Sequence, residues 1–125
     1  TTTTIAAQND MGLGTDAGNT FATASTPTAL SGSGFLVGNG DLDDYYIVSL
    51  TAGQTIEISM TPGAGSDFDL FLHDPFGVIQ ASSTTRSPGS AESISFTAEW
   101  TGEWRVRVSY FNGAGTYSLT ITPGP

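Results

Sequence analysis

Apolar and polar residues alternate with a period of two along most of this chain from residue 44 onward. Because successive side chains of a β-strand point to opposite faces, this alternation predicts strands with one buried and one exposed face. No segment keeps a helical period, so we expect an all-β protein. The apolar positions of these runs are Ile56, Ile58, Met60, Phe68, Leu70, Leu72, Ile94, Phe96, Ala98, Trp104, Val106, Val108, Tyr110, Tyr117, Leu119 and Ile121.

Turn-forming segments separate these runs about every ten residues. They are rich in Gly, Pro, Asn and Ser, which permit a positive φ or preset a turn. This pattern predicts an antiparallel β-sandwich or jelly roll of about eight strands. We expect it to span residues 16–125, after an extended N-terminal arm at residues 1–15. Before residue 40, the only candidate core anchors are Phe21, Leu30, Phe35, Leu36 and Val37.

The charge of the chain limits its partners. Its 12 acidic residues face only three basic ones, for a net charge of −9. Nucleic-acid binding needs clustered Lys and Arg, so we expect no nucleic-acid partner. No apolar run approaches the length of a membrane span, so we expect no membrane insertion. Without Cys, stability depends on packing and on any bound metal.

Three carboxylates gather just before a strand, at Asp41, Asp43 and Asp44. Carboxylates this close repel one another unless a cation lies between them. Oxygen ligands at short spacing, with no Cys and a single His, suit Ca²⁺ rather than zinc or copper. We interpret Asp41 and Asp44 as half of a calcium site, with Asp43 as a solvated charge or secondary ligand. A solvated acidic turn is the alternative.

Several motifs together resemble the bacterial pre-peptidase C-terminal domain family. They are the acidic segment and paired tyrosines at residues 40–50, the Ala-Gly-Gln turn at 52–54, and the Asp-Phe-Asp-Leu strand at 66–72. Residues 102–108 and 115–121 are similar to the closing strands of that family. The resemblance covers roughly residues 16 to 122.

This resemblance implies a non-catalytic jelly-roll sandwich, usually appended to secreted proteases and related to the collagen-binding modules of bacterial collagenases. It also implies how metal-binding members hold calcium, between an acidic or amide segment before an aromatic residue and two carboxylates before the paired tyrosines. The N-terminal half departs from the usual Glu of the family, and Asp10 is an additional candidate ligand. The matching positions here are Asp16 and Asn19 before Phe21, and Asp41 and Asp44 before Tyr45 and Tyr46.

Two features are alternatives for catalysis. Asp67 and Asp69 share a strand face, as a glycosidase pair would. We expect them instead to accept hydrogen bonds from a loop or to pair with Arg105 or Arg107. His73 is the only candidate general base, but neither a Gly-x-Ser-x-Gly turn nor a Cys accompanies it, so we expect a surface histidine. We therefore expect no enzymatic activity.

The first residues favour self-association. Residues 1–7 are uncharged, rich in β-branched side chains and free of Pro and Gly, so Thr1 to Gln8 fits an added strand on a neighbouring subunit. Disorder is the alternative. A head-to-tail contact of this kind grows into a filament when its symmetry does not close. Ser and Thr clusters at residues 1–4, 23–28 and 82–87 are candidates for O-linked sugars.

These patterns predict an extracellular or cell-surface structural domain that binds calcium and assembles into filaments through its N-terminal arm. The alternative is a binding module of a secreted hydrolase that recognises polysaccharide or fibrous protein through exposed aromatic side chains. Trp104 follows the inward alternation, so we expect it in the core. Trp100 is either an exposed ligand contact or a buried residue.

Overall fold

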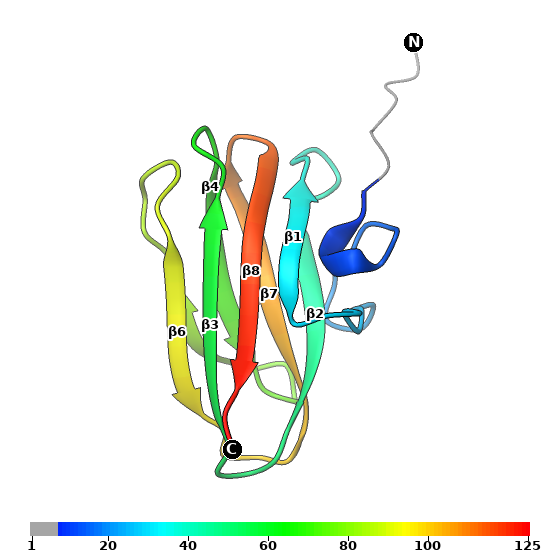
Figure 1. The fold of residues 1–125 in the computed structure, drawn as a ribbon, viewed down its shortest axis with the longest axis vertical. Helices are drawn as coiled ribbons and strands as arrows, with labels where there is room; N and C mark the ends of the chain where they lie inside the picture. Colours follow the sequence, from blue (N-terminus) through cyan, green and yellow to red (C-terminus); the bar gives the residue numbers. More distant parts are fainter. Residues whose placement is uncertain (1–7) are drawn as a thin grey trace.

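The computed structural model describes residues 8–125 as two antiparallel β-sheets packed face to face (Figure 1). A single-turn 3₁₀ helix, η1 (Asp10–Gly12), precedes the strands. The predicted sandwich of about eight strands is confirmed. The strands are β1 (Ser31–Leu36), β2 (Asp43–Leu50), β3 (Thr55–Pro62), β4 (Asp67–His73), β5 (Ile79–Ser83), β6 (Glu92–Thr97), β7 (Gly102–Asn112) and β8 (Gly115–Pro123).

Each sheet combines strands from distant parts of the chain. One sheet has the order β1-β8-β3-β6 and the other has the order β2-β7-β4-β5. Figure 1 shows the first sheet in front of the second. Apolar positions point into the space between them, as in β3, where Ile56, Ile58 and Met60 are buried. Trp104 is fully buried in this core, as predicted.

Two strands, β1 and β5, were not predicted as individual elements. β1 begins with Ser-Gly-Ser-Gly, and β5 leaves most of its side chains partly or fully exposed, so neither shows apolar alternation. Both form because a neighbouring strand supplies hydrogen bonds, β8 for β1 and β4 for β5. Of the predicted anchors before residue 40, Leu36 is fully buried, whereas Leu30 is 40% exposed.

The N-terminal segment packs beside β1 at one side of the sandwich (Figure 1). Met11 is buried in the core although its φ of 49° is uncommon outside glycine. A lone apolar residue between Asp and Gly carries no periodicity, so this anchor was not predicted. The strand proposed for Thr1 to Gln8 lies outside the described residues except at Gln8. The described helical segment is too short to cross a membrane.

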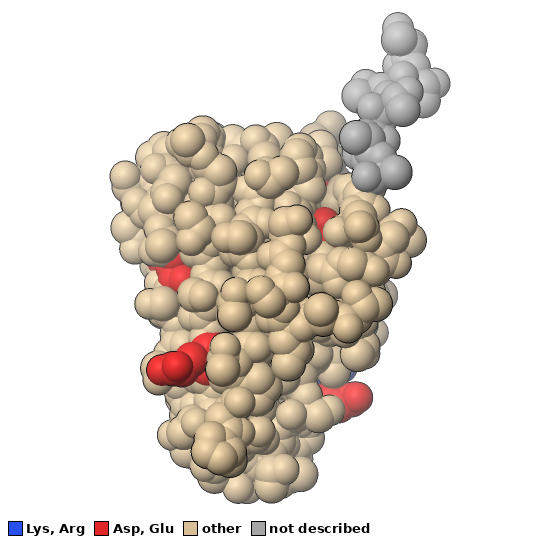
Figure 2. Space-filling view, viewed as in Figure 1, with Lys and Arg blue, Asp and Glu red and all other residues tan. Residues whose placement is uncertain are grey.

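The outer face of the sheet β1-β8-β3-β6 is nearly free of charge. Figure 2 shows this face as a broad neutral surface with a few acidic patches. On the strands, the exposed carboxylate is Glu57. The acidic residues therefore lie mostly at the edges, in the loops and on the other sheet. The exposed hydroxyls are those of Ser31, Ser33, Thr55, Ser59, Thr61, Ser93, Ser95, Thr97, Thr116, Ser118, Thr120 and Thr122.

Close packing of β1 on β8 leaves no room for a side chain at Gly34. A Cβ atom there would overlap the ring and hydroxyl of Tyr117, its pairing partner in β8. We expect Gly34→Ala to lower the free energy of unfolding by about 1–3 kcal/mol, because the buried ring would have to move. Gly65→Ala is the matched control, since open space surrounds that position, and it should change stability by less than about 0.5 kcal/mol. Equal urea midpoints for the two variants would contradict this packing.

Candidate metal centre

Asp10 ties the N-terminal segment to the sandwich. Its carboxylate is fully buried, and Oδ1 accepts a hydrogen bond from the backbone N–H of Phe35 in β1 (2.8 Å). Oδ2 accepts one from the backbone N–H of Ala17 (2.9 Å). The backbone N–H of Asp10 donates to the carbonyl of Thr15 (3.1 Å). One side chain thus holds the loop of residues 10–17 against an edge strand.

Asp41 and Asp44 approach the same place from the start of β2. Asp41 is 5% exposed, and its Oδ2 accepts hydrogen bonds from the backbone N–H of Val37 (3.0 Å) and the side chain of Gln8 (2.9 Å). Asp44 is fully buried, and its Oδ2 accepts a hydrogen bond from the hydroxyl of Tyr117 (2.6 Å). The acidic segment before β2 therefore turns inward rather than forming a solvated turn.

Side-chain oxygens of Asp10, Asp16 and Asp44 lie within 4.8 Å of one another. Asp41 lies close enough for its charge to raise the pKa of Asp44. Asn19 is at the rim, with its side-chain nitrogen 3.5 Å from Asp16 Oδ2. All five residues that the sequence suggested as ligands thus meet in one region. We call Asp10, Asp16, Asp41 and Asp44 the N-terminal carboxylate cluster.

Several oxygens in this region lack a donor among the described residues. Asp16 Oδ1 and Asp44 Oδ1 are covered from solvent and have no hydrogen-bond partner there. One end of the Asn19 amide faces the carbonyl of Asp43 (2.5 Å) and Asp41 Oδ1 (3.1 Å). If this end is the amide nitrogen, it donates to the carbonyl of Asp43 and to Asp41 Oδ1. If it is the amide oxygen, it is one more oxygen close to the carboxylates. A buried oxygen without a donor costs free energy, and a bound cation would remove that cost.

Burial raises the pKa of all four carboxyls in the cluster, because desolvation disfavours the charged form. For Asp44, desolvation and the charges of Asp10, Asp41 and Asp16 raise the pKa to about 10. The hydrogen bond from Tyr117 opposes this rise only in part. Without a cation, Asp44 therefore keeps its proton at neutral pH.

The three arginines bind elsewhere in the described part of the chain, and the sequence contains no Lys. Among the described residues, no side-chain cation therefore neutralises the cluster. The partners of the arginines are Asp69 for Arg86 (2.5 Å), Asp43 for Arg107 (2.8 Å), and the backbone carbonyls of Glu103 (2.6 Å) and Phe21 (3.4 Å) for Arg105.

The donor set of this region fits a hard divalent cation. Ca²⁺ takes oxygen ligands at about 2.3–2.6 Å, so two oxygens on one ion lie up to about 5 Å apart. The spacing of Asp10, Asp16 and Asp44 meets this limit. Zinc and copper prefer nitrogen or sulfur ligands, whereas the cluster offers carboxylate and amide oxygens. These residues therefore suit Ca²⁺.

Two tyrosine hydroxyls connect the cluster to the core. The hydroxyl of Tyr117 donates to Asp44 Oδ2 and also meets the hydroxyl of Tyr46. Both tyrosines are at most 2% exposed. Tyr46 is close to Asp44 in sequence, but Tyr117 comes from β8, 73 residues along the chain from Asp44. Only the pairing of β8 with β1 and β3 brings Tyr117 here, so nothing in the sequence indicates this contact beyond the inward position of Tyr117.

The partner of Asp69 follows one of the two predicted alternatives. Asp69 accepts a hydrogen bond from Arg86 in the connection between β5 and β6, as predicted for a loop, and does not pair with Arg105 or Arg107. The reason is that the connection between β5 and β6 returns along the start of β4, where the N–H of Gly89 donates to the carbonyl of Ser66 (2.8 Å). Asp43, which was expected to be solvated or a secondary ligand, pairs with Arg107 on the neighbouring strand β7.

His73 is buried rather than at the surface, with 6% exposure. Its Nδ1 donates to the carbonyl of Gly77 (3.0 Å), and its ring packs against the rings of Phe21 and Tyr45. Burial lowers its pKa, which favours the neutral form. The N-terminal loop that carries Phe21 covers this histidine, which strand alternation alone did not reveal. We therefore assign His73 a packing role.

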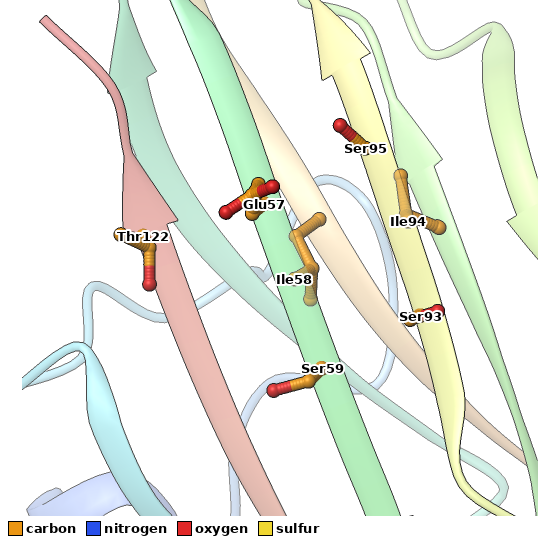
Figure 3. A pocket seen from close by; sticks show the side chains of 7 residues that line it. All are labelled: Glu57, Ile58, Ser59, Ser93, Ile94, Ser95 and Thr122. Atoms are coloured by element: carbon orange, nitrogen blue, oxygen red, sulfur yellow. The ribbon is translucent and has the colours of Figure 1, made fainter.

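A shallow hollow of about 310 Å³ lies on the outer face of the sheet β1-β8-β3-β6 (Figure 3). Figure 3 shows side chains of β3, β6 and β8 around it. Hydroxyls and one carboxylate offer hydrogen bonds to a ligand, but this lining holds no acid and base pair. The hollow therefore adds no catalytic candidate. Its lining residues are Glu57, Ile58, Ser59, Ser93, Ile94, Ser95 and Thr122.

Comparisons with known proteins agree with the resemblance seen in the sequence. Residues 43–123 match the sequence profile of the bacterial pre-peptidase C-terminal domain. No curated protein sequence matches the chain.

Solved structures that share the fold include domains from two bacteria. The pre-peptidase C-terminal domain of a collagenase from Bacillus anthracis is similar with a TM-score of 0.62 and 24% identity, over 74% of this chain and 87% of that one. PliG of Aeromonas hydrophila, a periplasmic inhibitor of g-type lysozyme, is similar with a TM-score of 0.55 and 15% identity, over 75% of this chain and 82% of that one. At these identities the likeness shows the fold alone.

In a chelator, the stability of the protein should fall as the pH rises from about 7 to about 8. The folded-state pKa of Asp44, about 10, exceeds its ordinary value of 3.8. The folded state therefore keeps a proton that the unfolded chain releases, and each such proton costs about 1.4 kcal/mol per pH unit in this range. This stabilisation is complete below the ordinary pKa and is lost as the pH rises toward the folded-state pKa.

Asp44→Asn tests this dependence, because an amide still accepts the hydrogen bond from Tyr117 but carries no charge. Thermal unfolding with EDTA should show a shallower pH slope for the variant than for the native chain. The lowered pKa of His73 keeps its titration below this pH range. Equal slopes for the two proteins would contradict a protonated Asp44.

Proposed function

Because the chain belongs to the bacterial pre-peptidase C-terminal domain family, we propose that it is a non-catalytic β-sandwich module in which calcium clamps the N-terminal segment to the sandwich. The observation that carries this proposal is the convergence of Asp10, Asp16 and Asp44 in a region that no described arginine reaches. Asp41 and Asn19 extend the donor set at its rim.

Calcium at this place would link three parts of the chain. Asp10 and Asp16 belong to the N-terminal segment, Asp41 to the connection before β2, and Asp44 to β2 itself. Unfolding separates these residues, so the ion binds the folded state in preference and stabilises it by mass action. The cation would replace the protons that the cluster otherwise retains and remove the repulsion among its charges.

We propose an extracellular or envelope location for this module. Extracellular calcium modules have dissociation constants of about 10⁻⁴–10⁻³ M, and we expect a constant in this range for this site. The similar domain of Bacillus anthracis belongs to a collagenase, and the similar protein of Aeromonas hydrophila is periplasmic. Family membership and an engaged His73 support a role in binding or structure rather than catalysis.

Calcium should raise the melting temperature of the native chain, with a stabilisation of about 2.7 kcal/mol at a hundred times the dissociation constant. Asp10→Asn and Asp16→Asn should each weaken binding in calorimetric titration and reduce this gain, because each removes a charged ligand. Glu57→Gln is the matched control, since it removes one acidic charge from the outer sheet face. An unchanged melting temperature of the native chain on addition of calcium would contradict the proposal.

Self-assembly is a second candidate function, supported by the contact of Gln8. Its side chain donates to Asp41 Oδ2 (2.9 Å), so the cluster fixes the point from which the preceding residues depart. We propose that Thr1 to Gln8 adds as a strand to the sheet edge of a neighbouring subunit. Residues 1–7 lie outside the described part of the chain, so this strand and O-linked sugars on residues 1–4 stay predictions.

The alternative function, binding of polysaccharide or fibrous protein, has its own structural support. Phe76 and Trp100 are 74% and 47% exposed and pack edge to face with ring centroids 5.9 Å apart. Exposed aromatic rings stack on sugars or form protein contacts. This pair, rather than the buried Trp104, is the candidate contact of a binding module.

Deletion of residues 1–8 should convert assembled protein into folded monomers, because it removes the added strand. Ile5→Pro is a milder variant that should have the same effect, since proline lacks the N–H that a strand needs. Electron microscopy and light scattering measure assembly, and circular dichroism checks the fold. Polymers that persist after deletion would contradict the arm hypothesis. If the native chain stays monomeric at high concentration and is retained on an insoluble polymer, the binding module is favoured.

A further inference from the structure

A second group of buried carboxylates lies at the opposite open edge of the sandwich and shares no residue with the N-terminal cluster. Oxygens of Asp67, Asp69 and Glu92 lie within 4.8 Å of one another. These residues are only 4%, 5% and 1% exposed. Asp67 and Asp69 belong to β4 of one sheet, and Glu92 begins β6 of the other.

The three side chains meet because β4 is incompletely covered by its edge neighbour. β5 pairs with β4 only from Leu70 onward, so the start of β4 has no strand partner on that side. The connection of residues 84–91 runs there instead, and the N–H of Gly89 donates to the carbonyl of Ser66 (2.8 Å). This connection leads directly into Glu92, which brings its carboxylate to the start of β4.

One of these carboxylates lacks a partner that its burial requires. Glu92 Oε2 is covered from solvent and unpaired among the described residues, although Oε1 accepts a hydrogen bond from Ser83 (2.5 Å). Buried polar groups in folded proteins are normally satisfied, so this oxygen indicates a missing partner beside Asp67 and Asp69.

Arg86 supplies part of the compensating charge. Its Nη1 lies 2.5 Å from Asp69 Oδ1, and its guanidinium stacks on the ring of Phe111 at 3.7 Å from the centroid. Three carboxylates and one guanidinium leave two negative charges at this edge. A divalent cation balances them, and the oxygen spacing lies within the limit for ligands of one Ca²⁺ ion.

We propose that Asp67, Asp69 and Glu92 form a second divalent-cation site, for calcium, that ties the two sheets together at this edge. The ion takes the unpaired Oε2 of Glu92 together with oxygens of Asp67 and Asp69, while Arg86 remains on Oδ1 of Asp69. The site closes the edge where β5 ends and the 84–91 connection begins.

Calorimetric titration of the chelated and dialysed full chain with CaCl₂ tests this site. The double variant Asp67→Asn, Glu92→Gln should bind one calcium ion fewer than the native chain and keep the binding due to the N-terminal cluster. Asp10→Asn should show the complementary loss. Glu57→Gln, which removes an acidic charge outside both clusters, should leave the stoichiometry unchanged. Uptake that Asp10→Asn abolishes completely would support the proposed function and overturn this second site.

Arg86→Gln provides an independent test that keeps all three carboxylates. Removal of a nearby positive charge should tighten calcium binding at this site about tenfold or more, without altering binding at the N-terminal cluster. If the double variant fails to fold, the calcium affinity of Arg86→Gln alone tests the second site. Native affinities and stoichiometry in Arg86→Gln would overturn the proposal and show that Arg86 is a structural ion-pair partner only.

Discussion

Burial of like charges without a cation from any described side chain is the constraint on which this structure depends. Folding brings four carboxylates from the N-terminal segment, the connection before β2 and β2 itself into one region. Backbone N–H groups donate hydrogen bonds to the carboxylates of Asp10 and Asp41 and hold them in place. These hydrogen bonds do not neutralise the negative charge of either carboxylate. The attachment of the N-terminal segment is therefore tied to what the solution supplies, protons or metal, rather than to packing alone.

Each of the two open edges of the sandwich holds a group of buried carboxylates. At one edge, Tyr117 of β8 and Tyr46 of β2 join their hydroxyls and reach Asp44, so a polar chain crosses from one sheet to the other. At the opposite edge, Glu92 of β6 meets Asp67 and Asp69 of β4. The sheets are apolar between these edges, with Trp104, Phe68 and Leu70 fully buried. Acidic groups thus lie where the core ends and where strand pairing is incomplete.

The sequence predicted the parts of this protein that follow from local pattern. Alternation revealed six strands and the buried Trp104, and the spacing of Asp41 and Asp44 indicated one half of the candidate site. β1 and β5 remained hidden because their pairing, not their side chains, makes them strands. The partner of Asp69, the burial of His73 and the contact of Tyr117 with Asp44 depend on which distant segments become neighbours. Residue periodicity carries no information about that choice.

The position of β8 has a consequence for when the sandwich can form. β8 lies between β1 and β3 and also brings Tyr117 to Asp44, so the sheet β1-β8-β3-β6 is divided until residues 115–123 are available. A nascent chain emerging from the ribosome lacks this strand and leaves the inner faces of both sheets open. Proteins whose strands pair across long stretches of sequence also fold slowly. The apolar core between the two sheets can therefore close only once β8 has been synthesised and has paired with both β1 and β3.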